Sequence, residues 1–130
     1  MGKILKNSEI NEGIKKMIEE NALGLATLNE NNEPHNIAIG YVKVVSKNQL
    51  LISDNYIEET IKNIKSNPKV SLAVWAKNWK ENCIGYELRG EAEYFTSGKW
   101  VDEIRKIPEN MGEPCKGAIL IKINKIKVLD

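Results

Sequence analysis

The sequence predicts a mainly β protein, a small antiparallel barrel of six strands with three short helices around it. Strand-like runs follow one another without a helix between each pair, which argues against a doubly wound parallel sheet. Closing the sheet also removes exposed strand edges, which promote aggregation. A chain of 130 residues can build one hydrophobic core but hardly two, so we expect a single domain over residues 1–130.

The first elements are expected to be an amphipathic helix and three strands. Apolar side chains recur on one helical face over residues 8–20, where Ser8 is available as the N-cap. The small apolar run 22–28 predicts a strand, and the polar cluster NENNEP after it predicts a hairpin loop. A second strand is expected from about His35 to Val45, and the third at 50–52, after the SKNQ turn.

The middle of the chain predicts a helix followed by two strands. Isoleucines at spacings of four and three indicate a helix that ends at Asn67–Pro68, because the residue before a proline is driven out of helical geometry. Strands are expected at 70–75 and 84–94. The second of these alternates apolar with charged residues, so we expect one of its faces to be buried and the other solvated.

A short helix and one long strand complete the predicted fold. Trp100, Val101 and Ile104 are spaced for a short helix, and PENMGEP has the composition of a loop. The final strand alternates through Ile123 and then changes phase before Ile126. This phase slip predicts a β-bulge in the last strand.

Composition and motifs exclude several classes of function. Nineteen Lys and Arg balance 18 Asp and Glu, so nothing favours a nucleic-acid partner. Hydrolase, kinase and dinucleotide motifs are missing from the sequence. Cys83, Cys115 and the single histidine, His35, do not make an obvious zinc site, so no metal is expected. Without a signal-like or membrane-length apolar run, we expect a cytoplasmic protein with no membrane partner.

The segment ISDNYIEETIKNIKSNPKVSLAVW is the most informative for function. A strand end runs through Ser53, Asp54 and Asn55 into the helix that carries Thr60 and Asn63. The free amides and the positive dipole end of a helix start can hold a phosphate, and a threonine hydroxyl adds a donor. Ordinary capping explains most Asp and Asn residues before helices, so the pattern alone leaves both roles open.

The runs DNYIEET, IKNIKSNPKVSLAVW and GYELRGEAEYFTSG resemble the FMN-binding split-barrel proteins related to pyridoxamine 5'-phosphate oxidase, especially the small stand-alone flavin-binding members. The resemblance extends upstream to GLATLNENNEPHNIAIGYVKV and downstream to GAILIKI, so it covers nearly the whole chain. It implies a six-stranded antiparallel split β-barrel, a homodimer, and one FMN per subunit near the dimer interface.

Carried over to this sequence, the resemblance implies three groups of cofactor-binding residues. The ring of the flavin would lie along the backbone and small side chains of PHNIAIG, that is Asn36, Ile37, Ala38, Ile39 and Gly40. The ribityl chain would be lined by Ser53, Asp54 and Asn55, and the phosphate would be held by Thr60 with Asn63. No catalytic side chain is assigned.

One residue departs from the pattern of the family. Similar proteins usually have a lysine or arginine directly before this threonine, whereas here Glu59 follows a second acid, Glu58. A carboxylate next to a phosphate is repulsive, by up to ~4 kcal/mol for unit charges in contact near a protein surface. Lys62, Lys65 or a lysine from elsewhere could compensate for it.

Several other polar and aromatic residues have simple structural interpretations. Trp75 is expected in the core or a dimer interface rather than beside the flavin. Arg89 is expected to be solvated or paired with a neighbouring glutamate. His35 is expected to be exposed or hydrogen-bonded, and Lys77 and Lys80 to be solvated.

Three hypotheses about function follow, from different classes. The first is an FMN-binding homodimer that acts as a flavin-dependent oxidoreductase or electron carrier, in which the protein orients and tunes the cofactor. The second is a flavin-free module, or one that binds deazaflavin or haem on the same fold. The third, a barrel for single-stranded nucleic acid, is the weakest, because it needs a basic groove with exposed aromatics and only 6% of the residues are aromatic.

Overall fold

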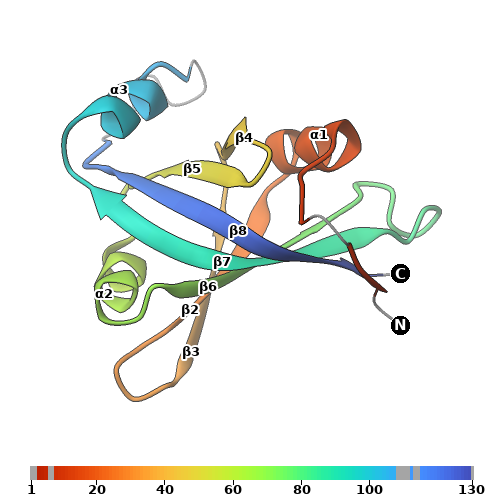
Figure 1. The fold of residues 1–130 in the computed structure, drawn as a ribbon, viewed down its shortest axis with the longest axis horizontal. Coiled ribbons are helices and arrows are strands. Elements are labelled where there is room, and N and C mark those ends of the chain that lie inside the picture. Colours follow the sequence, from red (N-terminus) through yellow and green to blue (C-terminus); the bar gives the residue numbers. More distant parts are fainter. Residues whose placement is uncertain (1–2, 6–7, 108–111, 113–114, 130) are drawn as a thin grey trace.

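A computed structural model describes residues 3–5, 8–107, 112 and 115–129 (Figure 1). The expected mainly β fold with three helices is confirmed, with all strand pairs antiparallel. The described elements are, in order, β1 (Lys3–Ile4), α1 (Glu12–Glu20), β2 (Leu23–Leu28), β3 (Pro34–Ile39), β4 (Lys43–Ser46), β5 (Gln49–Ser53), α2 (Glu58–Ser66), β6 (Lys69–Trp75), β7 (Gly85–Phe95), α3 (Lys99–Arg105) and β8 (Ala118–Leu129). The predicted PENMGEP loop lies, apart from Gly112, outside the described residues.

The described strands number eight rather than the six expected. The order in the sheet is β3-β2-β6-β7-β8-β5-β4, and β1 pairs with β8 through Lys3 and Ile4. The second predicted strand, 35–45, is divided into β3 and β4 because Tyr41 has a left-handed backbone with φ of 54°, which an extended ladder cannot accommodate. The two strands at the ends of the sheet are therefore joined directly by residues 40–42.

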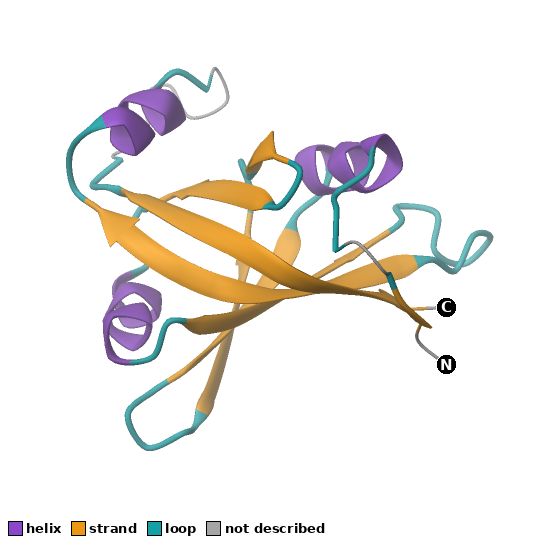
Figure 2. Ribbon diagram, viewed as in Figure 1, coloured by secondary structure: helices purple, strands orange, loops and turns teal. Residues whose placement is uncertain are grey.

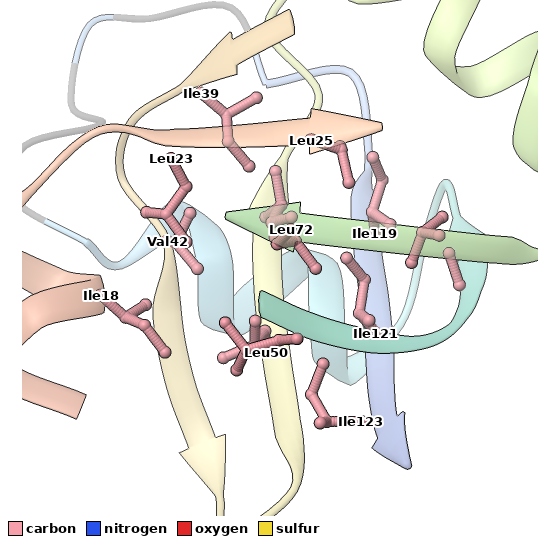
Figure 3. Close-up of a cluster of buried hydrophobic side chains, with 14 of the residues drawn as sticks. Ile18, Leu23, Leu25, Ile39, Val42, Leu50, Leu72, Ile119, Ile121 and Ile123 are labelled. Atoms are coloured by element: carbon pink, nitrogen blue, oxygen red, sulfur yellow. The ribbon is translucent and has the colours of Figure 1, made fainter. Parts of the chain in front are cut away.

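The hydrophobic core fills the interior of the barrel (Figure 3). Inward side chains such as Leu25, Leu72 and Ile121 come from β2, β6 and β8 and are at most 1% exposed. β5 is buried on both faces, since Leu50 points into this core while Leu51 joins a second cluster with α3. That two-sided burial explains why the run 50–52 is continuously apolar rather than alternating.

Both long helices begin and end for identifiable local reasons. α1 begins at Glu12, because the side chain of Asn11 accepts a hydrogen bond of 2.9 Å from the backbone N–H of Ile14. The prediction of Ser8 as the cap is wrong. Ser8 has a positive φ of 49°, and its hydroxyl donates to the Asn124 carbonyl. α2 ends at Ser66, directly before Asn67–Pro68, as the sequence predicts.

The bulge expected in the last strand is present. Arg89 of β7 pairs with Lys125, whereas the next residue, Gly90, pairs with Ile123, which leaves Asn124 as the extra residue of β8. Gly90 lies very close to β8 here. A Cβ atom added to it would come 2.1 Å from the carbonyl oxygen of Lys122.

The three helices lie around the barrel rather than between its strands (Figure 2). α1 packs against β4 and β6, α2 against β2 and β7, and α3 against β5 and β8. α2 thus contacts both β2 and β7, the strand that carries Tyr94. No helix among the described residues is long and apolar enough to cross a membrane.

Candidate functional site

The residues expected along a flavin ring alternate between the two faces of β3. Asn36 and Ala38 are exposed on the outward face, where they pair with Ala26 and Gly24 of β2. Ile37 and Ile39 contact the core instead, and Ile39 is only 6% exposed. A flat molecule outside the barrel would therefore meet the side chains of Asn36 and Ala38 but only the backbone of the two isoleucines.

Gly40, the last residue of that group, belongs to a different hollow. It lines a cavity of about 490 Å³ between the end of α1, the β3–β4 connection and the end of α3. Charged side chains, including Glu19, Lys43 and Lys106, surround this cavity. The Glu19 carboxylate accepts a hydrogen bond of 3.0 Å from the backbone N–H of Val44, and Lys43 is paired with Glu103, so these charges hold α1 and α3 to β4.

A shallow groove crosses the outward face of β2, β3 and β6. Its volume is about 260 Å³, and four of its seven lining residues have small side chains. The lining is Gly24, Ala26, Asn36, Ser71, Ala73, Glu87 and Leu129. A second hollow of about 270 Å³ shares Ala26 and Ser71 with it and extends towards Lys69 and Arg89. Glycine, alanine and serine side chains leave the sheet surface flat and accessible here.

One ion pair borders the groove. Glu87 accepts hydrogen bonds from the Ser71 hydroxyl, at 2.9 Å, and from the Arg89 guanidinium, at 3.0 Å. The bond from Arg89 is the main cause that lowers the pKa of Glu87 below its ordinary value, so the groove has a carboxylate that stays ionised. The predicted pairing of Arg89 with a neighbouring glutamate is confirmed.

Asp54 anchors the turn that leads into α2. Its carboxylate accepts a hydrogen bond of 2.6 Å from the Tyr94 hydroxyl and one of 3.2 Å from the backbone N–H of Ile57. Its backbone also bonds with Lys116 and Gly117. Asp54 is only 4% exposed, and its side chain holds the start of α2 against β7 through these hydrogen bonds.

The other members of this turn are close to Asp54. The Ser53 hydroxyl donates to the side-chain oxygen of Asn55 at 2.7 Å. Ser53 is buried and Asn55 is half-buried. The structure therefore brings Ser53, Asp54 and Asn55 together in one hydrogen-bonded turn, as their adjacency in the sequence requires.

The Tyr94 hydroxyl is perturbed by these surroundings. Burial, followed by the hydrogen bond to Asp54 and the charge of that carboxylate, raises the pKa of Tyr94 to about 12. Each cause favours the neutral phenol. Tyr94 thus stays a hydrogen-bond donor throughout the neutral pH range.

Thr60 and Asn63 face the barrel rather than the solvent. They are 1% and 2% exposed, and the Asn63 amide donates to the Thr27 hydroxyl of β2 at 3.0 Å. The Thr60 hydroxyl is buried and has no hydrogen-bond partner among the described residues. A buried hydroxyl without a partner is costly, so this atom is free to bond with a group not present in the structure.

The two acids at the start of α2 each contact a basic side chain. Glu59 Oε2 lies 2.6 Å from His35 Nδ1, which joins α2 to β3. Glu58 lies 3.7 Å from Lys116 Nζ, and this ammonium group also lies 4.5 Å from the centre of the Tyr56 ring. Sequence reasoning missed both pairs, because each joins residues far apart in the chain and no local pattern signals them.

The remaining predicted residues are placed on the surface. Trp75 is not in the core: it is 51% exposed at the end of β6. Lys77 and Lys80 are exposed, in agreement with the expectation, and Lys80 lies over the Trp79 ring. In the described part of the chain, no group of three or more His, Cys, Asp or Glu side chains is placed to hold a metal ion.

The sequence matches the pyridoxamine 5'-phosphate oxidase family over residues 9–129. An uncharacterized protein of Methanocaldococcus jannaschii is 33% identical over 125 residues, which cover 91% of this chain and 79% of that protein. The family match therefore extends across nearly all of the barrel and includes all three groups of candidate cofactor-binding residues.

Three solved structures share the fold. HupZ of Group A Streptococcus is 21% identical with a TM-score of 0.81, covering 90% of this chain and 91% of that one. An FMN-binding protein of Syntrophomonas wolfei is 21% identical with a TM-score of 0.77, covering 89% and 83%. An F420 reductase is 18% identical with a TM-score of 0.68, covering 90% and 98%. At these identities the likeness concerns the fold alone.

Proposed function

This chain belongs to the pyridoxamine 5'-phosphate oxidase family, and on that premise we propose that it binds FMN and acts as a flavin-dependent oxidoreductase or electron carrier. The observation that carries the proposal is the groove of about 260 Å³ on the outward face of β2, β3 and β6. Its small side chains allow a flat tricyclic ring to approach the sheet, with Asn36 of β3 along one side and Ala38 two residues further on the same exposed face.

The phosphate is proposed to lie at the start of α2, in line with the resemblance. Two features of the site support it: the free backbone donors of a helix start, and the buried Thr60 hydroxyl, which has no hydrogen-bond partner in the described part of the chain. The Lys116 ammonium group, 3.7 Å from Glu58, offsets part of the acidic charge at this position, and the contact with His35 holds the Glu59 carboxylate on the side of β3. Ser53 and Asn55 would then contact the ribityl chain from their turn.

The contribution of the protein is to bind, orient and shield the cofactor. FMN, when bound, supplies the electron-transfer chemistry. The groove fixes the plane of the ring, and the ionised Glu87 beside it opposes negative charge on any group at that edge. The Asp54–Tyr94 hydrogen bond holds the helix start in place.

We expect the fluorescence of FMN to change when the protein is added. We also expect the melting temperature of the protein to rise with the FMN concentration, because a ligand that binds only the folded state stabilises that state. The test is a titration with a visible absorption spectrum of the freshly purified protein. No spectral change and no thermal shift at saturating FMN would contradict the proposal. A released deazaflavin or haem, identified by mass, would favour the alternative ligands on the same fold.

Replacing Glu59 with lysine tests the position of the phosphate. Glu59→Lys exchanges repulsion for attraction and can add a charge-assisted hydrogen bond, so FMN affinity should rise roughly ten-fold or more. Thr60→Val should lower FMN affinity by removing the buried donor, while the stability of the empty protein stays the same or rises, because that hydroxyl bonds with none of the residues that the structure describes.

Two controls make the Glu59 measurement specific. Riboflavin, which lacks the phosphate, should respond little to either substitution. Glu12→Lys makes the same charge change at the exposed start of α1, away from the proposed site, and should leave FMN affinity unchanged. Equal shifts for FMN and riboflavin in Glu59→Lys would place the phosphate elsewhere.

A homodimer is the proposed assembly, since the groove is open to solvent on its outer side and a second subunit would cover the ring. Light scattering at working concentration should then give twice the monomer mass of 14.7 kDa. A purely monomeric protein that still binds FMN would refute the dimer and keep the cofactor assignment.

A further inference from the structure

Beside the proposed flavin groove lies another hollow, which the proposed cofactor site does not explain. It has a volume of about 250 Å³ and lies where β6, β7 and the end of β8 meet the β6–β7 connection. Its walls include Trp75, Trp79, Cys83 and Leu129. The two tryptophans are each 51% exposed and Leu129 is 40% exposed, so three large apolar side chains gather at one end of the sheet.

The strand register explains how the hollow forms. Trp75 of β6 pairs with Gly85 of β7, and Gly85 pairs in turn with Leu129 of β8, so the three lie in one row across the outward face. Glycine contributes no side chain between the two large ones. A Cβ atom at Gly85 would lie 2.8 Å from the Val74 carbonyl oxygen and 3.4 Å from Trp75 Cβ, so the close packing of the two strands here requires glycine. The result is a slot with an indole on one side.

The chemistry of the slot is uniform. None of its lining residues has a charged side chain: they are Ala73, Val74, Trp75, Trp79, Cys83, Ile84, Gly85 and Leu129. An ionic group entering it would lose hydration without gaining a partner, which is unfavourable. Indole faces attract flat aromatic rings by stacking or edge-to-face contact. The slot therefore favours an occupant that is planar, aromatic and uncharged.

The slot is also continuous with the groove proposed for the flavin ring. Ala73 and Leu129 line both hollows. With its small volume, below the ~300–1,000 Å³ of ordinary ligand pockets, it has room for one or two fused rings. An occupant would thus lie at the edge of the ring proposed above.

We infer that the slot formed by Trp75, Gly85, Leu129 and Trp79 is the binding site for the small-molecule redox partner, and that this partner is a planar, uncharged aromatic molecule. This assignment rests on the proposed function for its redox role, but the binding site itself does not depend on bound FMN. It names a substrate class that the family match leaves open.

The test is calorimetric titration of the full chain with 2-naphthol, an uncharged two-ring probe, in the absence and presence of FMN. We expect saturable binding in both conditions. The anionic analogue 2-naphthalenesulfonate should bind at least about ten-fold more weakly, because the slot offers no cation. Trp79→Ala should weaken 2-naphthol binding roughly ten-fold by removing one aromatic wall.

A matched variant distinguishes binding in the slot from nonspecific binding to exposed aromatic side chains. Tyr41→Ala removes an aromatic side chain of similar exposure, 46%, outside the slot, and should leave 2-naphthol affinity unchanged. Equal weakening in both variants, or equal binding of probe and sulfonate, would overturn the assignment. The assignment would also be wrong if the wild type is a dimer that does not bind 2-naphthol and Trp79→Ala converts that dimer to monomers. The slot would then be a contact with a second copy of the chain.

Failure of the proposed function gives a different result. If FMN does not bind but 2-naphthol still does, with the expected loss in Trp79→Ala, the slot is a ligand site and the flavin proposal is wrong. If FMN binds and 2-naphthol does not, the flavin proposal stands and this inference is wrong.

Discussion

Gly90→Ala is expected to remove a large part of the free energy of unfolding. The added methyl group would come 2.1 Å from the carbonyl oxygen of Lys122, 2.9 Å from its carbonyl carbon and 3.1 Å from the Cα of Ile123. All three are backbone atoms of β8, so no side chain can rotate away to relieve the contact. Overpacking in a core costs about 1–3 kcal/mol, and more where backbone must move, so we expect a loss of about 3 kcal/mol or more.

Urea denaturation of the wild type and variant measures this loss. Gly40→Ala is the matched control, because no atom lies within 4 Å of the position where its Cβ would be and its backbone is not left-handed. It should change the unfolding free energy little. A stable, fully folded Gly90→Ala protein would show that β7 and β8 can move apart at the bulge.

Asp54→Ala is expected to have the second large effect, on both stability and cofactor affinity. The change removes the acceptor of the Tyr94 hydroxyl and of the Ile57 N–H in a residue that is 4% exposed. Hydrogen bonds to a charged group contribute about 1.5–3 kcal/mol, so we expect a loss of about 3 kcal/mol. Because Asp54 holds the start of α2 to β7, FMN affinity should fall as well.

The conservative variants identify the cause of that loss. Asp54→Asn keeps the shape and one acceptor oxygen and should be the milder change. Tyr94→Phe removes only the hydroxyl, and a double-mutant cycle with Asp54→Asn gives the coupling between the two side chains. A coupling near zero would contradict the role of this hydrogen bond.

The same pair predicts a pH dependence of stability. The pKa of Tyr94 is raised from 10 to about 12 in the folded protein, so its contribution is fully present below pH 10 and is lost as the pH rises to 12. Tyrosinate absorbance should show a transition near pH 12 that Tyr94→Phe removes. Asp54→Asn should lower the pKa of Tyr94, because the negative charge beside the hydroxyl is removed, but the increase caused by burial should remain.

Local patterns were sufficient to predict much of the fold. The isoleucine spacing and Asn67–Pro68 identified α2 and its end, and the alternation in β7 separated its buried from its solvated face. The phase slip after Ile123 located the bulge at Asn124. Each of these signals depends on neighbours within a few residues, which is the range over which propensity and periodicity act.

The features that the sequence did not reveal depend on long-range contacts. β1 is only two residues long and exists because it pairs with the far end of the chain at Lys127 and Val128. The break at Tyr41 needs a left-handed residue that is not glycine, which no propensity rule favours. At the candidate site, the pairs of Glu59 with His35 and Asp54 with Tyr94 join residues 24 and 40 positions apart.

Burial on α2 was also not predicted from the sequence. Thr60 and Asn63 lie three residues apart on a helix rich in polar residues, yet both are buried, and among the described residues Asn63 has a hydrogen-bond partner whereas the Thr60 hydroxyl has none. Which face of α2 contacts the barrel is decided by packing against β2 and β7, so the orphaned Thr60 hydroxyl could be found only in the structure.

The bulge at Asn124 has a consequence for the accuracy of folding. β7 and β8 are the longest strands described, with 11 and 12 residues, and a slip of two residues between them would keep every apolar side chain on its correct face. Hydrophobic patterning therefore cannot exclude that misalignment. Gly90 can, because a two-residue slip would bring Leu88 or Ala92 to the place where the Lys122 carbonyl leaves no room for a Cβ atom. One glycine and one extra residue thus select a single alignment of the two strands.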